Sequence, residues 1–95
     1  GAQSMRENVP EVYERIRRGA IQEWEGDNVM IVHTINKQVE ACYEFFDILK
    51  KTGLSDEQLN GIIKRWTKGD IEGDFVMDYQ MIVYEIKKQM ENSDY

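Results

Sequence analysis

An internal repeat constrains this chain more than any other feature of its sequence. The stretch DNVMIVHTINKQVE, at residues 27–40, returns as DYQMIVYEIKKQME at residues 78–91, with eight of fourteen positions identical at a constant offset of 51. In each copy the apolar residues recur at spacings of three and four, which is the period of one face of an α-helix. We therefore expect the same amphipathic helix to occur twice.

The repeat continues upstream of each copy. At an offset of 50, RIRRGAI (residues 15–21) lies over RWTKGDI (residues 65–71), so that Arg15 matches Arg65 and Gly19 matches Gly69. Each half reads as a helix, a glycine-marked connection, an aspartate cap and a second helix. One such hairpin cannot bury its apolar face alone, whereas two hairpins packed together complete a core. We predict an all-α, compact four-helix domain built from a duplicated helical hairpin with pseudo-two-fold symmetry.

Local signals give the expected helix boundaries. Pro10 suits a first helical turn, Asp27 and Asp78 are suitable N-caps, and Ser55 with Gln58 has the spacing of a capping box. No strand is expected. The four helices are predicted near residues 9–24, 28–51, 56–68 and 79–92, which makes hairpin one about 9–51 and hairpin two about 55–92.

The length bounds the domain organisation. Residues 1–4 precede Met5 in a context typical of an expression scar, and we exclude them from the expected fold. Residues 5–95 are enough for a single domain with a modest core. Hydrophobic residues make up 41% of the chain, too many for a disordered one.

The predicted core follows one stripe of the second helix. Val32 and Val83 flank this stripe in the two copies and are assigned to packing. Gln38 and Gln89 fall inside it, although an unsatisfied buried amide costs about 1–3 kcal/mol. The two amides are expected to meet each other across the pseudo-axis, or to bind a backbone group or a Trp indole; the alternative is that they line a small polar pocket facing a ligand. The stripe consists of Ile31, Ile35, Val39, Cys42, Phe46 and Leu49.

Composition excludes several classes of function. The formal net charge is −6, and the one basic cluster, at residues 15–18, is too small for the basic face that nucleic-acid binding needs. No apolar run approaches the roughly 20 residues of a membrane span, and no signal peptide is visible. A lone Cys42 gives no disulfide framework, so a cytoplasmic location is expected.

No motif indicates catalysis, a metal or a cofactor. The acids in D-I-E-G-D-F-V-M-D, at residues 70–78, have the early spacing of a calcium loop, but Phe75 and Met81 stand where that loop needs Gly and Glu. The single His33 cannot form a zinc cluster, and Cys42 lies on the opposite side of the same helix. We expect a protein that is not an enzyme and holds no metal or cofactor.

The remaining candidates are binding residues. Tyr43 points off the apolar stripe, and exposed aromatic residues are common in partner contacts; Trp24 either does the same or covers one end of the core. A small anionic ligand could use the glutamines with the paired cations, although the net negative charge disfavours an anion. The full candidate set is Gln38, Gln89, Arg15, Arg65, Lys37, Lys88, Tyr43 and Trp24.

The repeated motif resembles one found in small phage and prophage proteins of unknown function. The matching residues are Asp27, Met30, Ile35, Lys37, Gln38 and Glu40, and again Asp78, Met81, Ile86, Lys88, Gln89 and Glu91. Those proteins often carry the motif once, near an aromatic and acidic stretch that Trp24-Glu25-Gly26-Asp27 resembles. Two copies here imply that relatives with one copy act as dimers.

Three functions stay open at this point. The resemblance implies a mobile-element accessory protein in a bacterial cytoplasm, which docks on a host protein and modulates it, for example as an anti-defence inhibitor. A small-molecule or nucleotide-signal sequestering protein is the second reading. A purely structural module that forms homo-oligomers is the third.

Overall fold

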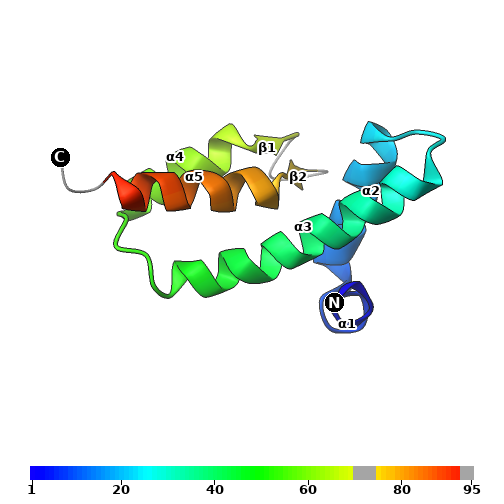
Figure 1. Ribbon diagram of the computed structural model, residues 1–95, viewed down its shortest axis with the longest axis horizontal. Helices are drawn as coiled ribbons and strands as arrows, with labels where there is room; N and C mark the ends of the chain where they lie inside the picture. The colour runs from blue at the N-terminus through cyan, green and yellow to red at the C-terminus, as the bar shows by residue number, and fades with distance from the viewer. Residues whose placement is uncertain (70–74, 93–95) are drawn as a thin grey trace.

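The computed structural model describes residues 1–69 and 75–92, and within them the chain is predominantly helical (Figure 1). The helices are α1 (Ala2–Asn8), α2 (Pro10–Glu23), α3 (Asn28–Leu49), α4 (Asp56–Arg65) and α5 (Tyr79–Glu91). The strands β1 (Thr67–Lys68) and β2 (Val76–Met77) pair antiparallel, with Thr67 opposite Met77 and Lys68 opposite Val76. None of the described helices is long and apolar enough to cross a membrane.

The helical class agrees with the sequence analysis, but the set of elements does not match the expected four helices. Residues 2–4, excluded above as a scar, form α1 together with Met5, whose side chain is completely buried. The β1–β2 pairing was not expected, because two residues per strand are too few to show a period-two pattern. Helix α4 also ends at Arg65, where the chain turns into β1.

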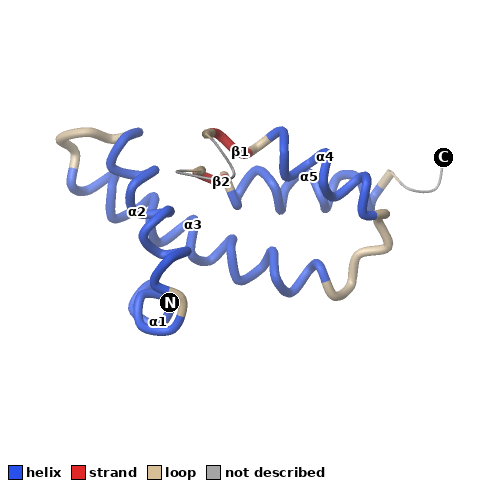
Figure 2. Tube along the Cα trace, turned by 180° about the vertical axis from the view of Figure 1, so that it is seen from behind, coloured by secondary structure: helices blue, strands red, loops and turns tan. Residues whose placement is uncertain are grey.

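Helix α3 is the packing centre of the fold, in contact with α1, α2 and α5. Helix α2 lies antiparallel to the N-terminal half of α3, and α1 crosses near the middle of α3 (Figure 1). Helix α5 lies beside the C-terminal half of α3 and runs in the same direction, since Gln38 contacts the start of α5 and Glu44 pairs with the later Lys87. Helix α4 packs on α5, and Figure 2 shows the same arrangement from behind.

The predicted helix caps are present. The Asp27 carboxylate accepts a hydrogen bond from the Met30 N–H at 3.1 Å, and Asp78 accepts one from the Met81 N–H at 3.2 Å. Ser55 and Gln58 form a reciprocal capping box at the start of α4. These contacts satisfy N–H groups that the first turn of a helix leaves without partners.

The core confirms part of the predicted stripe on α3. Ile35, Val39 and Cys42 are buried, but Phe45 and Ile48 take the places expected for Phe46 and Leu49, which are exposed. The prediction assumed one packing partner along the whole helix. Helix α3 instead packs against α2 on one side and α5 on another, so its buried stripe turns along its length.

The two copies of the repeat also differ in burial. Val32 is 58% exposed, although it was assigned to packing, whereas its counterpart Val83 is 4% exposed. Val83 lies where α5 packs along α3. The same face of the repeated helix is therefore covered in the second copy and open in the first.

A close approach between α2 and β2 gives a test of this packing. A Cβ added to Gly19 would lie 2.6 Å from Val76 Cγ1, whereas no heavy atom lies within 4 Å of a Cβ added to Gly61 in α4. Gly61→Ala should raise the free energy of unfolding by about 0.8–1.0 kcal/mol through helix propensity. Gly19→Ala has the same gain in helix propensity, but relieving the clash with Val76 costs about 1–3 kcal/mol. Its free energy of unfolding should therefore be lower than that of the wild type.

Urea unfolding of the two variants, followed by circular dichroism, measures the difference. Equal gains in stability from both alanines would show that β2 does not approach α2 as described.

Candidate binding site

Gln38 links the two hairpins. Its half-buried side chain extends from α3, donates from Nε2 to Asp78 Oδ1 at 3.0 Å and accepts at Oε1 from the Tyr79 N–H at 2.8 Å. The same Asp78 oxygen accepts from the Met81 N–H. Gln38 thereby completes the N-cap of α5 from a distant part of the chain.

The expected pairing of Gln38 with Gln89 is wrong. Gln89 is exposed, near the far end of α5. If a two-fold axis related the hairpins, Gln89 would contact Asp27 in the same way that Gln38 contacts Asp78. Asp27 is instead exposed and caps its own helix. Gln38 contacts the start of α5, whereas Gln89 lies near its end. The two glutamines are therefore separated by most of the length of α5. Of the partners left open above, Gln38 binds a backbone group.

Gln38 and Arg65 line the same cavity, so the structure brings two predicted binding residues together. The cavity has a volume of about 620 Å³ and lies between α2, α3, the end of α4 and the β1–β2 pair. Thr34, Gln22 and Lys68 add further polar groups to its wall. Its volume falls in the range of about 300–1,000 Å³ that is usual for small-molecule sites.

Several polar groups of this cavity are engaged within the chain. Arg65 pairs with Glu85, and the Trp66 Nε1–H donates to Glu85 Oε1 at 2.9 Å. Burial acts to raise the pKa of Glu85, but the hydrogen bonds from Arg65 and Trp66 together hold that pKa below its usual value. Arg65 is therefore occupied by a carboxylate.

Arg15 does not join Arg65 as the repeat suggested. Its guanidinium carbon lies 4.2 Å from the centroid of the Phe75 ring, in cation–π geometry. The two arginines thus have different partners, and they do not form a symmetric pair around one ligand.

Lys37 and Lys88 each lie near the same exposed aromatic residue, Tyr84. A groove of about 320 Å³ between α3 and α5 is lined by Lys37, Glu40 and Tyr84, among others. Tyr84 is 55% exposed, and Lys88 Nζ lies 5.7 Å from the centroid of its ring. We call this surface, consisting of Tyr84, Lys37, Lys87 and Lys88, the Tyr84 face.

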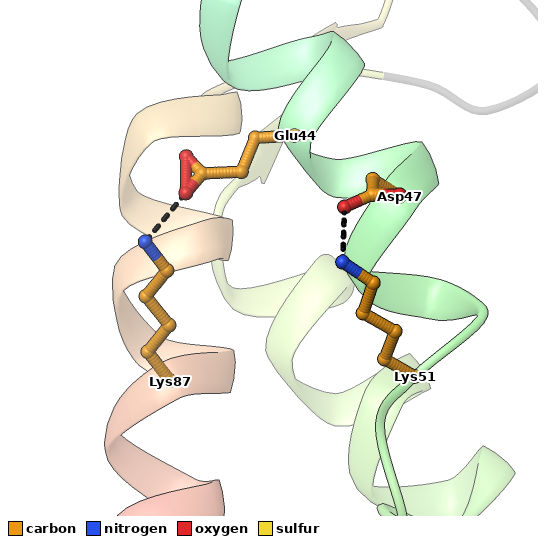
Figure 3. Close-up of polar contacts among 4 residues, drawn as sticks. All are labelled: Glu44, Asp47, Lys51 and Lys87. Atoms are coloured by element: carbon orange, nitrogen blue, oxygen red, sulfur yellow. Dashed lines mark hydrogen bonds and ion pairs between the residues drawn. The ribbon is translucent and has the colours of Figure 1, made fainter.

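An ion pair from the Tyr84 face joins the two helices. Lys87 from α5 and Glu44 from α3 point toward each other at 2.5 Å (Figure 3). Asp47 and Lys51, also drawn in Figure 3, pair at 2.8 Å near the end of α3. The first of these pairs neutralises Lys87, and Lys37 pairs with Glu40 at 4.0 Å, which leaves Lys88 beside the Tyr84 ring.

The aromatic candidates Tyr43 and Trp24 lie apart from both cavities. Tyr43 is 41% exposed on α3, as its direction off the stripe indicated. Trp24 is half-buried after α2, and its buried Nε1 has no hydrogen-bond partner in the described part of the chain. Sequence reasoning did not select Tyr84, because its repeat counterpart is the polar His33; a large aromatic residue on the polar side of α5 was the available signal.

The single cysteine is not an activated thiol. Cys42 is completely buried, and burial raises its pKa despite a hydrogen bond with the Tyr79 side chain. Burial and the neighbouring Cys42 also raise the pKa of the Tyr79 hydroxyl. A thiol needs a lowered pKa to act as a nucleophile near neutral pH.

Among residues 1–69 and 75–92, no group of three or more His, Cys, Asp or Glu side chains is placed to hold a metal ion. The acids at positions 70, 72 and 74, considered above for a calcium loop, lie outside the described residues. Comparisons of the chain with protein-family models, with curated proteins and with solved structures find no match.

The repeat supplies a matched pair of variants to test the role of Gln38. Gln38→Leu should lower the free energy of unfolding by about 1–3 kcal/mol, because it leaves the Tyr79 N–H without its acceptor. Gln89→Leu changes an exposed side chain and should have little effect. The double variant should show the sum of the two effects, measured by chemical denaturation. A large coupling energy between the glutamines would contradict these assignments.

The Glu85 contacts predict a pH dependence. The folded pKa of Glu85 lies below its unfolded value, so its stabilising contribution is fully present above the unfolded pKa and is lost as pH falls through the folded pKa. The stability difference between the wild type and Glu85→Gln should thus be largest near neutral pH and shrink on acidification. Thermal unfolding of both proteins across this range tests it, and a difference that does not change with pH would refute it.

Proposed function

We propose that this protein is a non-enzymatic binding protein of a phage or other mobile element, which docks on a host protein in the bacterial cytoplasm and modulates it. Inhibition of a defence protein is one form of such modulation. The observation that carries the proposal is the exposed Tyr84 on α5, placed among lysines above a groove between two packed helices. The resemblance of the repeated motif to one in small phage proteins supports the phage or mobile-element origin.

Tyr84 has the properties of an interface anchor. Tyrosine is enriched among the residues that contribute most binding energy, because it buries a large ring and retains a polar tip. Tyr84 stands on a helix whose opposite side, with Ile82 and Ile86, is completely buried, so the ring is held by a rigid support. Little conformational entropy is then lost when a partner covers it.

The charges around Tyr84 indicate the chemistry of the partner surface. Lys37 and Lys87 line the groove, but each pairs with an acid of the same groove, Glu40 and Glu44 respectively. Lys88 lies beside the Tyr84 ring and has no ion pair among the described contacts. A partner that accepts the Tyr84 ring in a pocket and presents a carboxylate to Lys88 would complement this face. Rim charges of this kind act mainly on association rate and specificity.

The repeat supports duplication of a helical hairpin as the origin of the fold. In this proposal the two copies then diverged at one exposed position, where the first copy has His33 and the second has Tyr84. The duplicated module then carries one docking residue on α5, while α3 serves as the packing centre.

Affinity capture from a lysate of the host of the encoding element tests the docking proposal. The wild type should retain a partner that Tyr84→Ala and Lys88→Glu lose, because both changes alter the Tyr84 face without touching the core. Tyr43→Ala, an exposed tyrosine on another side of α3, is the matched control and should retain it. Direct binding of the purified partner should then weaken at least tenfold with Tyr84→Ala. Binding unchanged by both alterations of the Tyr84 face would rule out this surface.

The cavity that contains Gln38 and Arg65 supports small-molecule or nucleotide-signal binding as a second candidate function. The net charge of −6 and the engagement of Arg65 by Glu85 act against an anionic ligand. A thermal-shift screen with nucleotides separates the two candidates: a shift that Arg65→Ala abolishes would favour the cavity over the Tyr84 face.

A further inference from the structure

The cavity between α2, α3, the end of α4 and the β1–β2 pair presents an apolar surface to a small molecule. Ile16 and Ala20 from α2 line it and are 4% and 2% exposed, and the half-buried Val76 from β2 also lines it. The Trp66 indole is part of the same wall, and its hydrogen bond to Glu85 holds the ring in place. Walls of this kind bind the apolar body of a ligand.

Two side chains of opposite charge line this cavity without pairing. Glu23 is the last residue of α2 and Lys68 lies in β1, and both are exposed. Among residues 1–69 and 75–92, neither makes an ion pair with the other or with a third residue. Arg65 of the same wall is instead paired with Glu85. One negative and one positive group of the cavity are thus available to a ligand.

The Thr34 hydroxyl is a third group available to a ligand. Thr34 lies on α3 one turn before Gln38, and both side chains line the cavity. Gln38 is engaged with α5, but the half-buried Thr34 makes no side-chain hydrogen bond within the part of the chain that the structure describes. A hydroxyl both donates and accepts, so it can bind either an ammonium or a carboxylate group.

We propose that this cavity binds a small zwitterion with an apolar body, of the class of a free amino acid or a short peptide. The ligand ammonium binds the Glu23 carboxylate, the ligand carboxylate binds Lys68, and Thr34 contributes a hydrogen bond. The apolar body lies against Ile16 and Ala20. This inference rests on the second candidate function, small-molecule binding in this cavity, and gives it a ligand class.

The two unpaired charges favour a zwitterion over other ligands. A nucleotide would bring several negative charges next to Glu23, in a chain whose net charge is −6, and Lys68 alone does not balance them. A ligand with one charge pairs with one of these residues and covers the other, and a covered charge without a partner is costly. An uncharged ligand covers both. A molecule that carries both signs satisfies the two groups together.

Isothermal titration calorimetry on the intact chain tests the ligand class. The probes are L-phenylalanine and phenylalanyl-phenylalanine as zwitterions, phenethylamine as the ammonium alone and 3-phenylpropionate as the carboxylate alone. At least one zwitterion should bind more tightly than both single-charge analogues, by about tenfold or more. The tighter of the two zwitterions identifies a free amino acid or a short peptide as the ligand.

Two results of this titration would overturn the proposal. Analogues that bind as tightly as the zwitterions would show that the two charges do not select the ligand. Binding of ATP without binding of either zwitterion would refute this ligand class and leave the second candidate function standing. Absence of binding by every probe, ATP included, would remove both.

Charge-removing variants assign each end of the ligand. Glu23→Gln should weaken the zwitterion and phenethylamine but not 3-phenylpropionate, whereas Lys68→Gln should weaken the zwitterion and 3-phenylpropionate but not phenethylamine. Both residues are exposed, so the helical circular dichroism spectrum should not change. Glu25→Gln alters an exposed glutamate that does not line the cavity and is the matched control.

The same titration separates the cavity from the docking surface. Tyr84→Ala leaves the cavity wall intact and should bind the zwitterion as the wild type does. Zwitterion affinity that neither Glu23→Gln nor Lys68→Gln changes would overturn the assignment of these two residues.

Discussion

The arrangement of the two hairpins depends on how Gln38 meets the first turn of α5. A helix N-terminus leaves several N–H groups without intrahelical partners, and here Asp78 takes one of them while Gln38 takes another. These short, half-buried bonds fix the level at which α5 lies along α3. From that level Lys87 reaches Glu44, and the Tyr79 ring packs 5.9 Å from that of Phe45.

The position of α5 along α3 also determines which surfaces of the two helices remain exposed. It sets Tyr84 beside Lys37, and so creates a groove from residues that are forty or more positions apart in the sequence. It also buries Val83 on α3 while leaving Val32, its counterpart, uncovered. The Tyr84 face therefore follows from one asymmetric contact between two similar helices.

The features that sequence reasoning predicted are those that local chemistry determines. Asp27, Asp78 and Ser55 cap helices because the groups they bind lie within three residues, and the burial of Cys42 follows from the helical period. The position of α5 along α3 was not predictable, because it depends on a bond between residues forty positions apart. The identical residues in the two copies led to the prediction of a symmetric arrangement. The structure instead places Gln38 and Gln89 in unlike surroundings. The candidate sites were predicted to a similar extent: Lys37 and Lys88 were selected, but Tyr84, which lies near both, was not.

Amide hydrogen exchange at Tyr79 tests this account most directly. The Tyr79 N–H is the first of α5 and would ordinarily exchange fast, but its bond to Gln38 Oε1 predicts protection close to that of the core helices. The amide of Asn28, at the equivalent position of α3 and exposed, should exchange rapidly. Similar fast exchange at both amides, measured by nuclear magnetic resonance, would contradict the claim that Gln38 fixes α5 on α3.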